Sequence, residues 1–441
     1  MKTVDEINEK IKRGEAVVLT AEEVVELARE KSPKKIAEQV DVVTTGTFAP
    51  MCSSGAVINF GHTTPPMRME KIELAGVEVY GGLAAVDGFL GATEESKADK
   101  SFGGAHIIEA LIEGKDLYLK AAAKGTDCYP GKEFEGYINK DMINDFFLFN
   151  PRNAYQNYAA ATNSSDRTKY TYMGKLLPHF GNVTYSTSGE LSPLLKDPQM
   201  ITIGLGTRIF LGGGTGYVVW PGTQFRNDVN VNQYGIPIGP ARTLALIGDA
   251  RRMNSRYLRA AYFKNYGVTL FVGIGVPIPV LNEEVAYFVS RSNEEIETVI
   301  EDYGRPERPI IAVTNYARLR EGWLELNGKK VKTSPLSSLI MGREISQVLK
   351  ERISGGGFLL TSPVEFFHEE RTLKQLEKKT HGEKIKLGEP SCVDCGVCVS
   401  VCASDALNLV DGKFTYEAEK CNNCGECIDA CPLGVELPPH E

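Results

Sequence analysis

Eight cysteines lie in the last fifty residues of the chain, and their spacing is typical of one kind of chemistry. Four of them follow the pattern C-x2-C-x2-C-x3-C, and the other four repeat the same intervals 29 positions later. A cubane iron–sulfur cluster needs four thiolates that converge on a small volume, and a loop with cysteines at i, i+3 and i+6 supplies three of them. The sequence therefore predicts two [4Fe–4S] clusters, with ligands from Cys392, Cys395, Cys398, Cys402, Cys421, Cys424, Cys427 and Cys431.

Other uses of these cysteines fit less well. Structural zinc also takes C-x2-C knuckles, but two runs of four cysteines exceed the needs of a four-ligand site. Disulfides require an oxidising compartment, and nothing in the sequence indicates export. The segment 386–441 instead resembles a bacterial-type ferredoxin with two clusters, in which the fourth cysteine of each run serves the other cluster. This resemblance implies Cys392, Cys395, Cys398 and Cys431 for cluster one, and Cys421, Cys424, Cys427 and Cys402 for cluster two.

The two remaining cysteines lie in loops rich in glycine, serine and proline. Cys52 is in the sequence FAPMCSSGA, and Cys128 is in GTDCYPG. A free cysteine is often only a small buried apolar residue. Catalytic groups, however, are frequently placed on loops, and the amides of a loop such as 53–55 can stabilise a thiolate or an oxyanion. Both cysteines are therefore candidates for catalysis.

The segments around these cysteines resemble the homocysteine-biosynthesis family of anaerobic microbes. The resemblance covers most of residues 1 to about 370 and implies the activity of an L-aspartate semialdehyde sulfurtransferase, which makes homocysteine from the aldehyde, sulfide-level sulfur and reducing equivalents. It also implies that Cys52 and Cys128 handle sulfur. Many members carry CBS domains where this chain carries the ferredoxin-like segment. The matching stretches are VVTTGTFAPMCSSGA (42–56), NFGHTTPPMR (59–68), GGLAAVDGFLGA (81–92) and the Cys128 loop.

The redox chemistry of such a reaction can be balanced from its substrate and product. Exchange of the aldehyde oxygen for sulfur gives a thioaldehyde, which is one two-electron step short of a thiol. Each cluster passes one electron at a time, so two clusters, or a Cys52/Cys128 disulfide couple that they feed, supply the pair. We hypothesise that Cys128 carries a persulfide that attacks the aldehyde, and that Cys52 resolves the linkage to a disulfide, which the clusters reduce. The two roles can be reversed.

Four further residues are weaker candidates for the site. His62 and His106 can protonate the departing oxygen or orient a thiolate, although histidines more often serve as structural hydrogen-bond donors. Arg226 and Arg68 lie in polar loops and can hold a substrate carboxylate by a bidentate contact, although most loop arginines face solvent. We predict these four as secondary site residues.

The composition indicates the compartment and excludes some partners. The chain has 441 residues and a net charge of −8, with no basic tract of the kind that binds nucleic acid. No apolar stretch approaches the roughly 18 residues of a membrane span. We therefore predict a cytoplasmic protein of an anaerobic cell, with neither nucleic acid nor membrane as a partner. The expected partners are L-aspartate semialdehyde, a sulfide or persulfide donor and an external low-potential electron donor such as ferredoxin; a homo-oligomer is left open.

The elements predicted along the chain describe a mixed α/β catalytic body (1–385) of undetermined topology, followed by a small α+β ferredoxin-like domain (386–441). Thr3 with Glu6 and Thr20 with Glu23 predict capped helices near the N-terminus. Short apolar runs separated by turns predict strands between residues 44 and 280. Further helices are expected over 105–113, 241–254 and 293–302, and a long helix is expected to open at Ser334.

Three classes of function fit these observations. The leading one is a reductive sulfur-transfer enzyme that makes homocysteine. The second is an electron-transfer subunit whose body docks onto another oxidoreductase, and the third is a sulfur-carrier or cluster-assembly protein. Anaerobic turnover with the aldehyde, sulfide and a low-potential donor separates the first class from the others, because only the first forms homocysteine.

Overall fold

The computed structural model describes residues 1–154, 156–367, 370–378 and 391–435. The chain divides into two compact units, Met1–Leu373, which we call the body, and Lys374–Glu441, the C-terminal unit. The boundary predicted between residues 385 and 386 lies outside the described residues. The body combines helices with several sheets, so the predicted mixed α/β class is confirmed.

The largest sheet of the body has nine strands and is antiparallel throughout. Inward-facing apolar residues alternate with partly exposed ones along its central strand, where Phe146 and Leu148 are buried. This sheet carries the candidate site. In order it contains β19 (Leu258–Phe263), β20 (Gly267–Gly275), β16 (Arg208–Leu211), β17 (Gly214–Pro221), β18 (Leu244–Asp249), β10 (Asp145–Asn153), β4 (Gly55–Asn59) and β7 (Asp87–Gly91), and β3 (Thr47–Pro50) pairs with β20.

Three smaller sheets complete the framework of the body. A mixed six-stranded sheet has the order β23 (Ile310–Asn315), β22 (Glu297–Asp302), β11 (Ala160–Thr162), β14 (Asn182–Tyr185), β25 (Lys329–Pro335), β24 (Trp323–Leu326). An antiparallel four-stranded sheet has the order β6 (Val77–Val79), β5 (Lys71–Leu74), β8 (Leu117–Ala122), β9 (Glu133–Ile138). The third sheet is β1 (Val18–Thr20), β2 (Val42–Thr44), β21 (Pro277–Pro279). Two antiparallel pairs are separate from these sheets: the hairpin β12 (Lys169–Thr171)–β13 (Gly174–Leu176), and the long-range pair β15 (Gly204–Leu205)–β26 (Glu365–Phe366).

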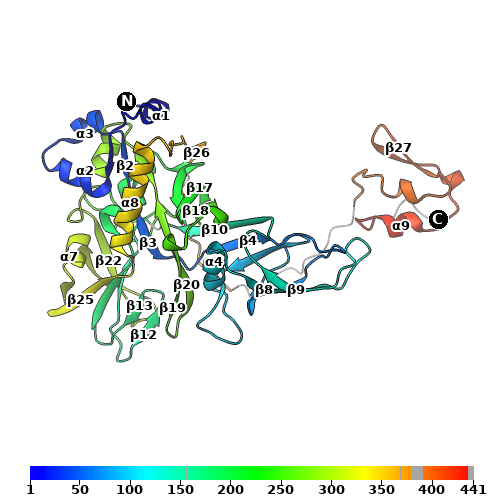
Figure 1. Ribbon diagram of the computed structural model, residues 1–441, viewed down its shortest axis with the longest axis horizontal. Coiled ribbons are helices and arrows are strands. Elements are labelled where there is room, and N and C mark those ends of the chain that lie inside the picture. The colour runs from blue at the N-terminus through cyan, green and yellow to red at the C-terminus, as the bar shows by residue number, and fades with distance from the viewer. Residues whose placement is uncertain (155, 368–369, 379–390, 436–441) are drawn as a thin grey trace. The chain divides into compact units, whose positions relative to one another are not determined.

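Helices pack against these sheets (Figure 1). The longest, α8 (Leu339–Ser354), packs on β1, β2, β3 and β20 and buries Ile345, Leu349 and Ile353 in a shared core. Both predicted N-terminal capping boxes are present, at Thr3 and at Thr20. The other helices of the body are α1 (Val4–Arg13), α2 (Ala21–Ala28), α3 (Pro33–Gln39), α4 (Gly104–Ile112), α5 (Pro193–Lys196), α6 (Glu283–Val289) and α7 (Tyr316–Arg320).

A glycine allows α8 to approach the strand that leads to Cys52. A Cβ atom on Gly46 would lie 2.0 Å from the carbonyl oxygen of Gly342 and 2.9 Å from the amide nitrogen of Ser346. Both are backbone atoms in α8, so neither can turn aside. The helix and the β2–β3 connection therefore meet only because residue 46 lacks a side chain.

We expect Gly46→Ala to destabilise the body by about 3 kcal/mol or more, because the overpacked backbone must shift. Gly91→Ala is the matched control, since a Cβ there would have nothing within 4 Å. The measurement is the midpoint of urea unfolding by tryptophan fluorescence, which reports on the body because both tryptophans, Trp220 and Trp323, lie in it. Equal midpoints for the two variants would contradict the prediction.

Two of the predicted helices are wrong. Residues 244–249 form β18, which pairs with β10 on one side and β17 on the other. Residues 297–302 form β22, where Thr298, Val299 and Ile300 are buried between β11 and β23. In both cases long-range strand pairing outweighs local helix signals. The long helix is confirmed, but it begins at Leu339 with Ser338 as its cap, because residues 329–335 belong to β25.

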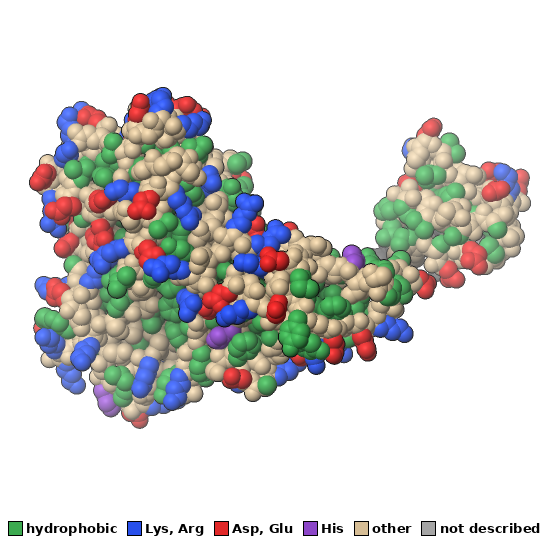
Figure 2. All heavy atoms as spheres, in the orientation of Figure 1, with side chains coloured by type: hydrophobic (Ala, Val, Ile, Leu, Met, Phe, Trp, Pro, Cys, Tyr) green, Lys and Arg blue, Asp and Glu red, His purple; other side chains and the backbone are tan. Residues whose placement is uncertain are grey.

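The surface of the body carries mixed charge. On the face shown in Figure 2, lysines and arginines are interspersed with acidic side chains. Within the described residues, no helix has the length and apolar character needed to cross a membrane.

The described part of the C-terminal unit contains one hairpin and one short α-helix. The hairpin is β27 (Leu407–Val410) with β28 (Lys413–Tyr416), and the helix is α9 (Glu426–Ala430). Its small core packs Leu407 and Phe414 against the cysteines Cys398, Cys402 and Cys427. The cysteines therefore take the place that apolar side chains have in a larger domain.

Candidate active site

Cys52 lies on a tight turn between two strands of the nine-stranded sheet. β3 ends at Pro50, and the turn is closed by a hydrogen bond from the Ser54 amide to the Met51 carbonyl, 3.0 Å. The Met51 amide donates to the carbonyl of Leu270 in β20, 2.8 Å. The backbone on both sides of Cys52 is thus fixed by the sheet.

Two hydroxyl groups donate hydrogen bonds to the sulfur of Cys52. The Thr269 hydroxyl lies 3.2 Å from Sγ, and the Tyr266 hydroxyl lies 3.9 Å from it. Burial, and then the neighbouring Cys52 sulfur, raise the pKa of Tyr266, so this hydroxyl keeps its proton and remains a donor. Such donors can stabilise a negative charge on the sulfur of a thiolate or a persulfide.

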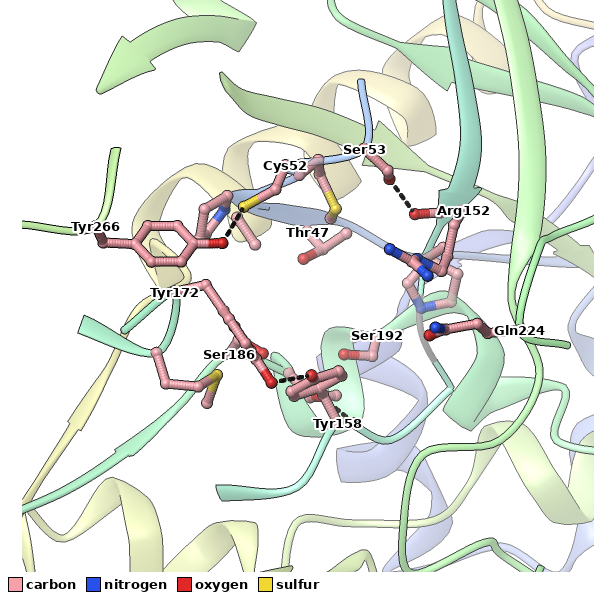
Figure 3. Close-up of a pocket in the computed structure, with 17 residues that line it drawn as sticks. Thr47, Cys52, Ser53, Arg152, Tyr158, Tyr172, Ser186, Ser192, Gln224 and Tyr266 are labelled. Carbon is pink, nitrogen blue, oxygen red and sulfur yellow. Dashed lines mark hydrogen bonds between the residues drawn. The ribbon is translucent and has the colours of Figure 1, made fainter. Parts of the chain in front are cut away.

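A cavity of about 360 Å³ opens beside this sulfur. Eight of its seventeen described lining residues bear a hydroxyl group, and Figure 3 shows the labelled side chains gathered around the cavity. Among the described residues that line the cavity, Arg152 is the one charged side chain. The hydroxyl-bearing residues of the lining are Thr47, Ser53, Tyr158, Tyr172, Ser186, Thr187, Ser192 and Tyr266.

Arg152 reaches the cavity from a bulge in β10. Asn150 lies opposite Leu246 and Asn153 opposite Leu244, so β10 carries one residue more than β18 at this point. A bulge of this kind bends a strand and redirects its side chains. Figure 3 shows the guanidinium pointing into the cavity from the side opposite Tyr266.

The bulge is bonded directly to the Cys52 turn. The Ser53 hydroxyl lies 2.7 Å from the carbonyl oxygen of Arg152 and 2.8 Å from Oδ1 of Asn150. The Asn150 amide donates to the Ser54 hydroxyl at 2.8 Å, and Oδ1 of Asn150 accepts the Arg152 amide at 3.0 Å. The turn that carries the thiol and the bulge that carries the cation are thus one hydrogen-bonded assembly.

Two tyrosines of the cavity lining, Tyr158 and Tyr172, belong to a hydrogen-bonded network that continues to Tyr303. The Tyr158 hydroxyl donates to that of Tyr172 at 2.7 Å, and the Tyr172 hydroxyl lies 2.8 Å from that of Tyr303. Arg308 donates to Tyr172 at 2.9 Å and stacks over the Tyr303 ring. The Tyr172 ring also meets Tyr266 edge-on, 6.0 Å between centroids. This network holds the hydroxyls of Tyr158 and Tyr172 in fixed positions beside the cavity.

Lys196 is fully buried at the end of α5, the helix whose Pro193 lines the cavity. Its ammonium group donates to the carbonyls of Val289 and Arg291, at 2.8 and 2.7 Å. Burial lowers the pKa of Lys196 to about 7. The buried charge therefore penalises the folded state most at and below neutral pH.

We expect this lysine to make the stability of the body increase above neutral pH. Because the folded-state pKa is near 7 and the unfolded value is about 10.4, the unfolded chain binds more protons between these values, and the free energy of unfolding rises with pH. Between these pH values, the free energy of unfolding of the wild type should rise by up to about 1.4 kcal/mol per pH unit relative to that of Lys196→Met. Urea unfolding at several pH values measures this difference, and parallel profiles would refute it.

Cys128 lies outside the lining of this cavity. It is exposed, in the loop between β8 and β9 of the four-stranded sheet. This loop packs on the segment 59–68. The Gly131 amide donates to the Pro66 carbonyl at 3.0 Å, and the Tyr129 ring stacks on His62, with 5.8 Å between the ring centroids. His62 therefore adjoins the Cys128 loop, and no contact joins Cys128 to Cys52 among the described residues.

The other secondary candidates lie elsewhere. His106 caps α4, where its Nδ1 accepts the Gly103 amide at 3.2 Å, and burial lowers its pKa. Arg226 pairs with Asp228 at 2.7 Å, and Arg68 lines a separate hollow along the four-stranded sheet. None of the three lines the Cys52 cavity. Sequence reasoning missed Arg152, although Pro151 inside an apolar strand pattern was a signal of the bulge.

Two hollows in the C-terminal unit are each bordered by four cysteines. One is lined by Cys392, Cys395, Cys398 and Cys431, and the other by Cys402, Cys421, Cys424 and Cys427. Each set combines three cysteines of one run with the fourth of the other, which fits the donor set of a cubane. No three potential ligands among the described residues are close enough to share a single metal ion, and a cubane does not require this, because each iron binds its own cysteine.

The backbone around the two hollows repeats with the sequence. The amides of Asp394 and Asn423, 29 positions apart, donate to the sulfurs of Cys392 and Cys421, both at 3.4 Å. The amides of Ala406 and Val435, again 29 apart, donate to Cys402 and Cys431 at 3.3 and 3.4 Å. Such N–H···S bonds stabilise thiolate ligands and tune the potential of a cluster.

Comparison with known proteins agrees with these two units. Residues 16–360 match the family model "Homocysteine biosynthesis enzyme, sulfur-incorporation", and residues 374–435 match that of a 4Fe-4S dicluster domain. A protein of Methanocaldococcus jannaschii named L-aspartate semialdehyde sulfurtransferase is 49% identical over 88% of this chain and 76% of its own length. A protein of Methanosarcina acetivorans with the same name is 49% identical over 86% and 74%.

The C-terminal unit has relatives of its own. A ferredoxin-like protein in the nif region of Azotobacter vinelandii is 39% identical over 10% of this chain and 53% of its own length. No solved structure matches the chain. The chain therefore belongs to the family of sulfur-incorporating homocysteine biosynthesis enzymes, and it carries a 4Fe–4S dicluster domain with two [4Fe–4S] clusters.

Proposed function

We propose that the chain is an L-aspartate semialdehyde sulfurtransferase that forms L-homocysteine reductively. One aldehyde, one bisulfide, two electrons and three protons give one thiol and one water. The observation that carries the proposal is the Cys52 sulfur, which accepts two hydroxyl hydrogen bonds and borders a cavity with one cation. The body around it is similar to two proteins that bear this enzyme's name.

Cys52 carries the sulfur that attacks the aldehyde. Bisulfide opens a Cys52–Cys128 disulfide, which gives a Cys52 persulfide and a Cys128 thiolate, so the disulfide takes up the two electrons that the sulfide loses. The terminal sulfur of the persulfide then forms a bond to the carbonyl carbon, and the carbonyl oxygen takes up a proton. Attack of Cys128 on the Cys52 sulfur re-forms the disulfide and releases a thiohemiacetal, which loses water to give the thioaldehyde that the two electrons reduce. The Tyr158 hydroxyl lines the same cavity and can exchange its bond to Tyr172 for one to the carbonyl oxygen as this oxygen gains charge. The surroundings of the two cysteines favour this assignment over the alternative in which Cys128 attacks, because Cys128 is exposed and does not line the cavity that contains Arg152.

Cys128 exchanges sulfur with the external donor or resolves the persulfide linkage. Its exposure suits reaction with a sulfide or persulfide donor outside the protein. Direct exchange between the two sulfurs requires the Cys128 loop to move, because the described residues show no contact between them. His62, which stacks on Tyr129 of this loop, can orient the loop or move a proton there.

The electrons for the final step come through the C-terminal unit. A [4Fe–4S] cluster held by the cysteines of this unit would supply one electron at a time, and an external donor such as a ferredoxin would replace that electron. We assign Cys392, Cys395, Cys398 and Cys431 to one cluster and Cys421, Cys424, Cys427 and Cys402 to the other, because each set borders one hollow.

The test is anaerobic turnover of the cluster-loaded protein with L-aspartate semialdehyde, sulfide and reduced ferredoxin, followed by derivatisation of the thiol product. We expect homocysteine that requires all three reactants. Sulfur bound by the protein without aldehyde-dependent product would favour a sulfur carrier. Electron transfer to a second oxidoreductase without homocysteine would favour an electron-transfer subunit.

A further inference from the structure

We infer that Arg152 binds the carboxylate of the substrate, and that Ser53 and Asn150 position its guanidinium by holding the backbone of Arg152 against the Cys52 turn. The inference deepens the proposed function and rests on it. It predicts that the enzyme selects small aldehydes that carry a carboxylate, and that the carboxylate matters more for selection than the amino group does.

The charge of the cavity supports this selection. Arg152 is partly buried, and among the described residues its guanidinium has neither an ion pair nor a hydrogen bond. Other arginines of the same sheet region are paired, such as Arg226 with Asp228 and Arg251 with Asp249. A guanidinium withdrawn from water without a counterion is stabilised by an anionic ligand, and its fork matches a carboxylate.

The described lining also lacks a group that would select an ammonium by charge. It includes no aspartate or glutamate, so an amino group meets only hydroxyls, amides and backbone carbonyls there. A substrate with a carboxylate at one end and an aldehyde at the other is therefore held at its charged end by Arg152. This leaves the aldehyde to meet the sulfur of Cys52 across the cavity (Figure 3).

The positioning of the cation follows from the bonded assembly described above. The Ser53 hydroxyl contacts the Arg152 carbonyl oxygen and Asn150 Oδ1, and Ser53 is the residue next to Cys52. A shift of the bulge would therefore move the turn as well. Ser53 and Asn150 act as positioning residues, because they touch neither the sulfur nor, in this arrangement, the carboxylate.

The first test compares two alkylating agents at Cys52 and needs no turnover. Iodoacetate and iodoacetamide both react with a thiolate at their CH2 carbon and release iodide, so that they transfer a carboxymethyl and a carbamidomethyl group respectively. Only iodoacetate carries a carboxylate. We expect Arg152→Gln to lower the ratio of iodoacetate to iodoacetamide rates at Cys52 at least about tenfold, because the attracting charge is lost. Peptide mass spectrometry measures both sites, and the ratio at Cys128 is the internal control, which should not change.

Positioning has its own readout in the same assay. Ser53→Ala should reduce the iodoacetate preference at Cys52 by about threefold or more while the iodoacetamide rate stays within about twofold, because the charge is retained but displaced. If Arg152→Gln leaves the ratio at Cys52 unchanged, the binding of a carboxylate is overturned. If only Ser53→Ala leaves it unchanged, the positioning role is overturned.

The second test uses turnover with two truncated aldehydes. Succinic semialdehyde keeps the carboxylate and lacks the amine, whereas 3-aminopropanal keeps the amine and lacks the carboxylate. Arg152→Gln should lower kcat/KM for succinic semialdehyde on the order of 100-fold and for 3-aminopropanal less than about threefold, with partial rescue by Arg152→Lys. Arg251→Gln, which removes two surface ion pairs, is the control.

The outcomes separate this inference from the proposed function. Two outcomes would overturn the role of Arg152. In the first, Arg152→Gln lowers kcat/KM equally for both aldehydes. In the second, Arg226→Gln lowers kcat/KM selectively for succinic semialdehyde and Arg152→Gln does not. If the wild type forms no thiol from any aldehyde, the proposed function fails, and the alkylation ratio still decides whether Arg152 attracts a carboxylate to Cys52.

Discussion

Cys52→Ala will abolish homocysteine formation while the iron content of the protein stays at the wild-type level. Cys52 carries the nucleophilic sulfur of the proposed reaction, and the other sulfurs among the described lining residues are the thioethers of Met51 and Met173. We expect a loss of about 1,000-fold or more, since removal of a nucleophile leaves only binding and electrostatic stabilisation. The measurement is anaerobic product formation together with iron analysis.

Two matched variants show whether this loss reflects chemistry or damage to the fold. Thr269→Val and Tyr266→Phe each remove one hydroxyl donor to the sulfur and keep the shape of the side chain. Each should lower turnover by about tenfold, as expected for one hydrogen bond to a charged group. Full activity in Cys52→Ala would end the proposed role. An equal loss in all three variants, with early unfolding, would indicate damage to the fold.

Local sequence patterns were sufficient to predict those features that depend only on residues close together in the chain. The capping boxes at Thr3 and Thr20 require only four consecutive residues, and both form. The cluster ligands could be predicted from local sequence as well, because three cysteines of each set lie within seven residues. For these features the chain needs no information from distant strands.

Features that depend on distant strands could not be read in the same way. Residues 244–249 have an apolar run that suits a helix or a strand, and their place between β10 and β17 decides the outcome. Arg152 is the clearest case at the site. It reaches the cavity because β10 bulges against β18, and its position relative to Cys52 depends on Ser53, which is about a hundred residues away in the chain.

The exchange of the fourth cysteine between the two clusters makes a prediction that single variants cannot test but double variants can. If Cys431 belongs with Cys392, Cys395 and Cys398, then Cys392→Ala/Cys431→Ala damages one cluster and leaves the other, about four iron atoms. Cys421→Ala/Cys431→Ala damages both, although its two cysteines are in the same run. Without the exchange, Cys392→Ala/Cys431→Ala would damage both clusters, and Cys421→Ala/Cys431→Ala would damage only one.

Both double variants should form homocysteine at least about 100-fold more slowly than the wild type, because each lacks part of the two-electron supply. Cys52 should still react with iodoacetamide at the wild-type rate, since the body keeps its own core. Iron analysis and the electron paramagnetic resonance signal of the reduced protein measure the clusters, and product analysis measures turnover. Wild-type turnover in the variant that retains no cluster would mean that the electrons reach the thioaldehyde by a route outside this unit.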